Sequence, residues 1–312
     1  MKVFLHQSCK SPSICSNYSN RIFAISKSPN HQISQLDLTT RIRQSQTCLC
    51  VGLDTDINKI PPHLLRYENP VLEFNRQIIE ATLPHCVAYK INTAFYESMG
   101  SRGWQILEET EKLIPATHFK IADAKRADIG NTTAHYAKAF FEHMNFDAIT
   151  ASPYMGLDCI EPFLAYKDKY TILLALTSNP GSVDFEQGDF GGRLLYEEVM
   201  LKAAEKAGPE QLMFVVGATK AETFSHIRSL VPDHFFLVPG IGAQGGDLDM
   251  VMKLGMNKNI GLLVNSSREI IYASNGEDFA QKAAEAAARV SGKMGRRFGN
   301  LVWQQKLSTL RK

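Results

Sequence analysis

The chain has 312 residues, of which 44% are hydrophobic and 21% are charged, and this balance is typical of a globular protein with a large core. The net charge of +2 is too small to indicate a nucleic-acid partner or a strongly acidic one. No apolar run approaches the roughly 20 residues that cross a bilayer, so we expect a soluble, cytoplasmic protein. The length alone fits one large α/β domain or two smaller domains.

Residues 1–34 differ in composition from the rest of the chain. They contain no Asp or Glu, many Ser and Asn, and a single arginine, Arg21. An organellar transit peptide is compatible with the lack of acidic residues, but such peptides are usually richer in arginine. We interpret the segment as a disordered tail, or as the result of a translation start that was placed too far upstream. The predicted domains are therefore a tail, 1–34, and one catalytic domain, 35–312.

The six cysteines, at positions 9, 15, 48, 50, 86 and 159, do not form two pairs with the spacing of metal ligands. We expect buried, reduced thiols and no zinc site.

From Leu36 onward, short apolar runs alternate with amphipathic segments. The runs are bounded by Gly, Pro or Asp, which favours strands that are buried on both faces. The predicted strands are Cys48–Asp54, Val87–Thr93, His118–Lys125, Ala148–Pro153, Thr171–Ser178, Leu212–Thr219, His234–Gly242 and Ile260–Arg268.

The segments between these runs have apolar residues at three- and four-residue spacing, which predicts helices. They are 70–83, 104–114, 132–144, 193–207, 221–231 and 277–295, and the basic end 295–312 is expected to continue the last one on the surface. Strands and helices that alternate over roughly 250 residues predict a single (β/α)8 TIM barrel. A doubly wound open sheet is the alternative.

Charged residues follow several of the apolar runs. In a barrel, catalytic groups gather at the carboxyl ends of the strands, and an unpaired charge is costly there. We therefore expect the charged residues on or directly after predicted strands one to three to converge on one mouth: Asp54, Lys90, Asp123, Lys125 and Asp128. Asn92 lies two residues after Lys90 and is expected on the same strand face.

A second group of residues indicates a phosphate site. The run Gly240–Gly246 follows the seventh predicted strand, and Ser266-Ser267-Arg268 ends the eighth. Barrels often bind phosphate at these two loops, where backbone N–H groups and an arginine can surround the oxygens. No P-loop and no dinucleotide-binding fingerprint is present in the sequence.

The run Asp123-Ala124-Lys125-Arg126-Ala127-Asp128-Ile129-Gly130-Asn131-Thr132 resembles the D-x-K-R-x-D-I-G-x-T signature of the orotidine 5'-phosphate decarboxylase family, in its larger branch. The resemblance covers about residues 36–290. It extends, in family order, to 51–54, Lys90-Ile91-Asn92, 177–181 and 238–246. It implies a homodimeric enzyme that converts orotidine 5'-phosphate to UMP in pyrimidine biosynthesis, with neither a metal nor a cofactor.

The same resemblance implies a role for each matching residue. Asp54 and Lys90 would hold ribose hydroxyls, Asn92 would line the pocket, and Asp123 would lie beside the substrate carboxylate. Lys125 would donate the proton, while Asp128 and Thr132 would reach the neighbouring subunit's site. The expected base and phosphate contacts are Ser178, Pro180, Gly242, Gln244, Ser267 and Arg268.

Loss of CO2 from a pyrimidine C6 leaves an electron pair in the ring plane, where the π system cannot spread it. A fixed ammonium such as Lys125 can stabilise this charge and deliver a proton. The segment Pro180–Gly192 is the candidate lid. Two alternatives remain: a Mg²⁺-dependent sugar-phosphate decarboxylase of the same barrel type, and a catalytically silent nucleotide-binding barrel.

Overall fold

The computed structural model describes residues 35–241 and 246–310. The predicted tail, 1–34, and residues 242–245 and 311–312 lie outside these ranges, so the proposed division into a tail and a barrel domain stays a prediction at its N-terminal boundary. None of the helices in the described part of the chain is both long enough and apolar enough to span a membrane.

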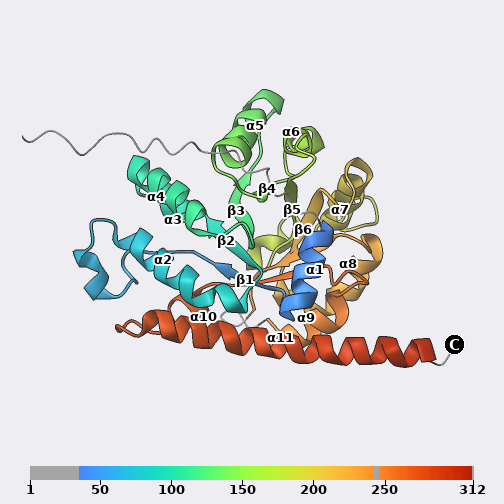
Figure 1. The fold of residues 1–312 in the computed structure, drawn as a ribbon. Helices are drawn as coiled ribbons and strands as arrows, with labels where there is room; N and C mark the ends of the chain where they lie inside the picture. Colours follow the sequence, from blue (N-terminus) through green and yellow to red (C-terminus); the bar gives the residue numbers. More distant parts are fainter. Residues whose placement is uncertain (1–34, 242–245, 311–312) are drawn as a thin grey trace, which may run out of the picture. The chain divides into compact units, whose positions relative to one another are not determined.

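Eight parallel strands form a closed barrel, in which each strand pairs with the next and β8 pairs with β1 (Figure 1). They are β1 Leu49–Gly52, β2 Ala88–Asn92, β3 Phe119–Arg126, β4 Ala148–Ala151, β5 Tyr170–Leu176, β6 Leu212–Val216, β7 Phe235–Val238 and β8 Leu262–Ser266. The predicted barrel is therefore confirmed, and the alternative of an open sheet is wrong. Most predicted strands were too long at their carboxyl ends, because the last residues of these predicted runs lie in the loops of the mouth, outside the strand pairing.

The helices surround the strands. They are α1 Gln35–Ser45, α2 Pro70–Thr82, α3 Ala94–Glu97, α4 Gly100–Leu113, α5 Gly130–Ala137, α6 Glu161–Leu164, α7 Leu195–Lys206, α8 Phe224–Leu230, α9 Leu248–Gly255, α10 Arg268–Ile271 and α11 Phe279–Leu310. The six predicted helices correspond to α2, α4, α5, α7, α8 and α11. The segment predicted as one helix, 132–144, changes from α5 to a π-helical turn at Lys138–His143. Four-residue helices such as α3, α6 and α10 are too short to produce a periodic pattern.

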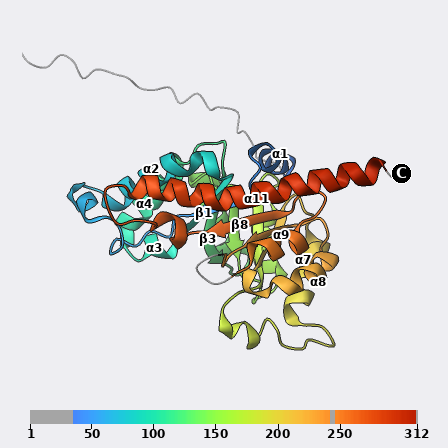
Figure 2. The ribbon, with the colours of Figure 1, turned by 90° about the horizontal axis from the view of Figure 1, so that it is seen from below.

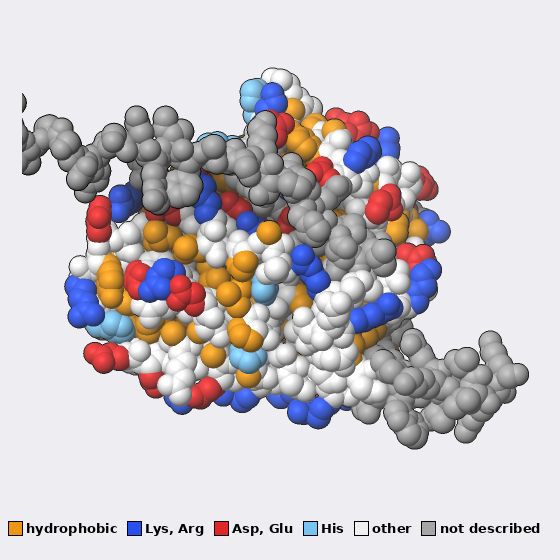
Figure 3. Space-filling view, viewed as in Figure 1, with side chains coloured by type: hydrophobic (Ala, Val, Ile, Leu, Met, Phe, Trp, Pro, Cys, Tyr) orange, Lys and Arg blue, Asp and Glu red, His pale blue; other side chains and the backbone are white. Residues whose placement is uncertain are grey.

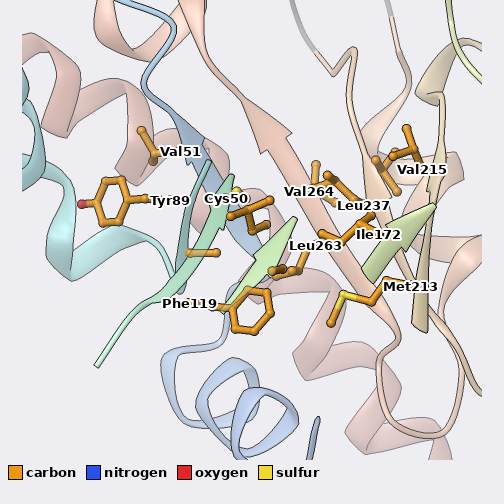
Figure 4. Packing of buried hydrophobic residues seen from close by; sticks show 14 of the residues in the cluster. Cys50, Val51, Tyr89, Phe119, Ile172, Met213, Val215, Leu237, Leu263 and Val264 are labelled. Carbon is orange, nitrogen blue, oxygen red and sulfur yellow. The ribbon is translucent and has the colours of Figure 1, made fainter. Parts of the chain in front are cut away.

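Side chains alternate between the interior of the barrel and the surrounding helices. In Figure 4, Phe119, Ile172 and Met213 point into the barrel, and Tyr89 points away from it. The Tyr89 hydroxyl donates to the Ile79 carbonyl of α2 at 3.1 Å. This alternation also decides which polar residues on the same strands can reach the mouth.

Helices from both ends of the sequence complete the barrel. Helix α11 packs against α2 and lies across β1 (Figure 2). Helix α1 contacts loops at the amino ends of the strands: Thr39 Oγ1 donates to the Asn259 carbonyl at 3.2 Å, and Arg41 donates to the Ala116 carbonyl at 3.4 Å. On the face shown in Figure 3, basic and acidic side chains are interspersed.

Candidate active site

A cavity of about 510 Å³ lies at the carboxyl ends of the strands. Leu174, Val215 and Leu237 form its apolar part. Eight of the residues predicted from the sequence also line it: Asp54, Lys90, Asn92, Asp123, Lys125, Ser178, Ser267 and Arg268. The cavity therefore combines an apolar wall with charged and polar groups from at least five strand ends.

Two lysines and two carboxylates form a connected chain on one wall of this cavity. Lys90 Nζ lies 2.8 Å from Asp123 Oδ2 and 3.5 Å from Asp54 Oδ1. Lys125 Nζ lies 2.6 Å from the other oxygen of Asp123, Oδ1. Asp123 thus accepts hydrogen bonds from both lysines, and Lys90 contacts both carboxylates. Each charged group therefore lies next to a group of opposite charge.

Burial and pairing act on these groups in opposite directions. Burial favours the neutral amine of Lys90, but attraction to Asp123 and Asp54 outweighs it and raises the pKa of Lys90 above its ordinary value. Burial likewise opposes ionisation of Asp123, yet Lys90 and Lys125 hold the pKa of Asp123 well below its usual range. Both residues are therefore charged at neutral pH.

Two tyrosines hold the loop that carries Asp54. The Tyr272 hydroxyl donates to the Asp54 carbonyl at 3.1 Å and accepts from the Asp56 N–H at 2.7 Å. The Tyr96 hydroxyl donates to the Leu53 carbonyl at 3.0 Å. These contacts fix the backbone on both sides of the Asp54 side chain.

Asp128 and Thr132 do not line the cavity of their own chain. Asp128 Oδ1 accepts the Ile129 N–H at 2.7 Å, and in the described part of the chain no ion pair joins Asp128 to a lysine. Of the five charged groups expected to converge, the structure brings four to the cavity of this chain; Asp128 lies two residues after the end of β3 and is not among the lining residues. The implied role of these two residues in a neighbouring subunit stays a prediction.

The cavity is also lined by residues of the two predicted phosphate loops: Gly240, Ser267 and Arg268. Gly240 has φ +94°, a conformation that favours glycine. At Gly52, an added Cβ would lie 1.9 Å from Ser267 Oγ, so β1 and the β8 loop can approach this closely only with glycine there. Gly242 and Gln244, the other predicted contacts, lie outside the described residues.

Glu186 connects the candidate lid to the end of β5. Its carboxylate accepts the Thr177 N–H at 2.7 Å and the Thr177 hydroxyl at 2.8 Å, and it also lines the cavity. Pro180 begins a short 3-10 turn, Pro180–Val183, and does not line the cavity.

Polar residues at or near this site that sequence reasoning did not assign to it include Thr150, Glu186 and Asn265. Asn265 is 7% exposed, and its Oδ1 has no hydrogen-bond partner within the described ranges. Its position at the end of an apolar strand was the available signal. Thr150 and Glu186 had none, because a strand threonine and a loop glutamate are both common.

The four described cysteines are buried and have free thiols, as predicted: Cys48, Cys50, Cys86 and Cys159. Burial raises the pKa of Cys48 to about 12. No three His, Cys, Asp or Glu side chains among residues 35–241 and 246–310 are arranged to hold a metal ion.

Residues 47–283 match the model of the "Orotidine 5'-phosphate decarboxylase / HUMPS family". The chain belongs to this family. It is 55% identical over 260 residues to the orotidine 5'-phosphate decarboxylase of Flavobacterium johnsoniae, covering 82% of this chain and 95% of that one. The corresponding protein of Phocaeicola vulgatus is 53% identical over 266 residues, covering 84% and 98%.

Solved structures of the family have the same barrel. The OMP decarboxylase of Leishmania donovani has a TM-score of 0.69 and 36% identity, over 83% of this chain and 98% of that chain. The UMP synthase of the same organism has a TM-score of 0.70 and 38% identity, over 82% of this chain but only 56% of the longer synthase. The part of the synthase that matches this chain therefore makes up about half of the synthase.

Proposed function

We propose that this protein decarboxylates orotidine 5'-phosphate to UMP, with Lys125 as the proton donor and without a cofactor. The observation that carries the proposal is the Asp54–Lys90–Asp123–Lys125 chain on the wall of a 510 Å³ cavity. Curated relatives more than 50% identical over most of the chain are named orotidine 5'-phosphate decarboxylase, which supports this substrate.

The reaction needs a positive charge and a proton at one carbon. The C6–carboxylate bond breaks, CO2 leaves, and the electron pair stays on C6. A proton moves from Lys125 Nζ to C6, and the amine then regains a proton from water. Lys125 suits this step because its side chain is 49% exposed toward the cavity while Asp123 holds its ammonium. Arginine is too weak an acid for the same transfer.

We assign Asp123 chiefly to positioning. A bare carboxylate about 4 Å from the substrate carboxylate would raise its energy by roughly 4 kcal/mol at an effective dielectric near 20. Both oxygens of Asp123 accept from ammonium groups, which offsets much of that repulsion. Asp54 and Lys90, next to Asp123, would bind ribose hydroxyls, and Asn92 would line the same side.

The base and the phosphate would take up the rest of the cavity. Ser178 would bind the pyrimidine edge, and Arg268 would bind the phosphate with Ser267. Gln244, Gly242 and Pro180 complete the proposed contacts on the strength of the sequence resemblance. Binding energy from the phosphate would hold the base against Lys125 in a productive orientation.

We further propose a homodimer in which Asp128 and Thr132 reach the partner's cavity. Apolar side chains are exposed in the loops that follow β3 and β4: Ile129 is 64% exposed, Tyr154 80% and Met155 54%. Exposed apolar groups that gather on neighbouring loops are typical of an interface. A second copy of the chain that covered them would bring Asp128 close to a site other than its own.

The first experiment follows the absorbance of orotidine 5'-phosphate with purified protein, with and without EDTA, and repeats it with Lys125→Ala. We expect loss of the orotate chromophore that survives EDTA and disappears in the variant. Activity abolished by EDTA would favour the Mg²⁺-dependent sugar-phosphate chemistry. No turnover by the wild type would favour a silent binder.

The dimer is tested by mixing two inactive variants, Lys125→Ala and Asp128→Ala, after joint refolding. In a mixed dimer with shared sites, one site carries both lesions and the other carries none. About a quarter of wild-type activity is then expected from random pairing. A mixture that stays inactive would place Asp128 in its own subunit's site.

A further inference from the structure

Strand β3 is irregular where it carries the two central catalytic candidates. Its pairing with β4 joins Ala122 to Ile149 and then Arg126 to Ala151. Three residues of β3, 123–125, therefore lie opposite one residue of β4, Thr150. Such a bulge redirects side chains and removes ladder hydrogen bonds, so the groups that it frees need other partners.

The backbone at Lys125 shows the effect of the bulge. Its φ is +49°, in the left-handed region that residues other than glycine rarely adopt. This conformation costs about 1–3 kcal/mol unless surrounding contacts hold it. A backbone that relaxed to the ordinary extended form would point the Lys125 side chain elsewhere.

The side chain of Thr150 makes the contacts that the ladder loses. Its Oγ1 accepts the Lys125 N–H at 2.9 Å and donates to Asp123 Oδ1 at 3.1 Å. Asp123 Oδ1 is also the atom that accepts from Lys125 Nζ. Thr150 is 1% exposed and does not line the cavity, so it contacts both residues from behind.

We infer that Thr150 is a positioning residue of this site: its hydroxyl fixes both the left-handed backbone of Lys125 and the carboxylate that holds the Lys125 ammonium. The inference rests on the proposed function of Lys125. Because the hydroxyl acts on the reacting ammonium and not on the substrate, its loss should lower kcat and leave KM nearly unchanged.

The test compares four proteins in the orotidine 5'-phosphate assay. Thr150→Val keeps the shape and removes the hydroxyl, and Thr150→Ser keeps the hydroxyl. Thr171→Val is the matched control. Thr171 lies on β5, where it pairs with Ile149 of β4, and its buried Oγ1 has no hydrogen-bond partner within the described ranges. Loss of the hydroxyl should lower kcat about 10- to 100-fold. KM should change less than about threefold, and Thr150→Ser and Thr171→Val should stay near wild type.

Turnover by the wild type is measured first, since its absence would refute the proposed function and not this inference. With an active wild type, an unchanged kcat in Thr150→Val would overturn the inference. An equal loss in Thr150→Ser, or in Thr171→Val, would also overturn it, because packing and not the hydroxyl would then be responsible. If Thr150→Val does not fold, kcat for Thr150→Ser against Thr150→Ala makes the same comparison.

Discussion

At the amino end of β3, Lys120 Nζ lies 2.5 Å from Glu111 Oε1, and the two side chains are 10% and 4% exposed. At the carboxyl end of the same strand, Lys125 Nζ lies 2.6 Å from Asp123 Oδ1, and the Lys125 side chain is 49% exposed. The groups and distances are nearly the same, but their surroundings differ. Helix α1 contacts the loops at the amino end, whereas the carboxyl end opens into the cavity.

This difference shows why one lysine is suited to chemistry and the other is not. Lys120 lies on β3, and its side chain is buried against α4, where it pairs with Glu111 away from the cavity. Lys125 faces a space that a substrate can enter. Barrel enzymes in general divide their strands in this way, with chemistry at the carboxyl ends and stability at the amino ends.

The largest expected effect is that of Lys125→Ala on turnover. We expect kcat/KM to fall by about 10⁴-fold or more, since both the charge and the proton donor are lost. The free energy of unfolding should change by less than about 1 kcal/mol, because the Lys125 side chain is half-exposed and the buried Asp123 keeps its ion pair with Lys90. Urea unfolding followed by circular dichroism measures the second quantity. Lys125→Arg keeps the charge, and full activity in that variant would contradict the proton-donor role.

Lys120→Met should have the opposite profile. It leaves Glu111 buried without a partner, which costs about 3–5 kcal/mol of unfolding free energy. Turnover per folded molecule should stay close to that of the wild type. The double variant Lys120→Met/Glu111→Leu removes both charges and should recover most of the stability. Destabilisation by the double variant as large as that by the single one would show that the pair itself is stabilising.

Glu186→Ala tests whether the hydrogen bonds between Glu186 and Thr177 affect substrate binding and not the stability of the fold. Without the two Thr177 contacts, the segment Pro180–Gly192 loses an anchor beside the cavity. We expect KM to rise by about tenfold, with little change in stability. Glu186→Gln keeps an acceptor for the Thr177 N–H and should lie near the wild type. Unchanged KM in Glu186→Ala would remove the lid from the proposal.

The smallest effect concerns pH. The pKa of Asp123 is lowered by its lysines, so its stabilising contribution is present above the ordinary value of 3.8 and is lost as pH falls through the folded-state pKa. Asp147, whose side chain accepts the Lys120 N–H, has a pKa raised by burial, so its contribution is present at low pH and is lost as pH rises. Urea titrations of Asp123→Asn and Asp147→Asn between about pH 3 and pH 7 should therefore show opposite slopes relative to wild type. Parallel slopes would contradict this assignment.

Much of the molecule could be predicted because its signals are local. Alternation of apolar runs with amphipathic helices identified all eight strands and six helices. Charged residues within or just after otherwise apolar strands identified Asp54, Lys90, Asp123 and Lys125, since a charge is tolerated there only at a mouth. The strand ends were less accurate: β7, for example, ends at Val238, and the Pro239 and Ile241 that follow line the cavity outside the pairing of the barrel strands.

The sequence by itself determined the order of strands and helices and the charged groups of the mouth. The spacing of apolar residues and the chemistry of each side chain are properties of short segments. Tertiary structure alone decided that Asp128 does not line the cavity of its own chain and that a bulge places 123–125 opposite Thr150. These features depend on the register between strands that are distant in sequence. Register is set by the packing of the whole barrel and has no signature in a single strand.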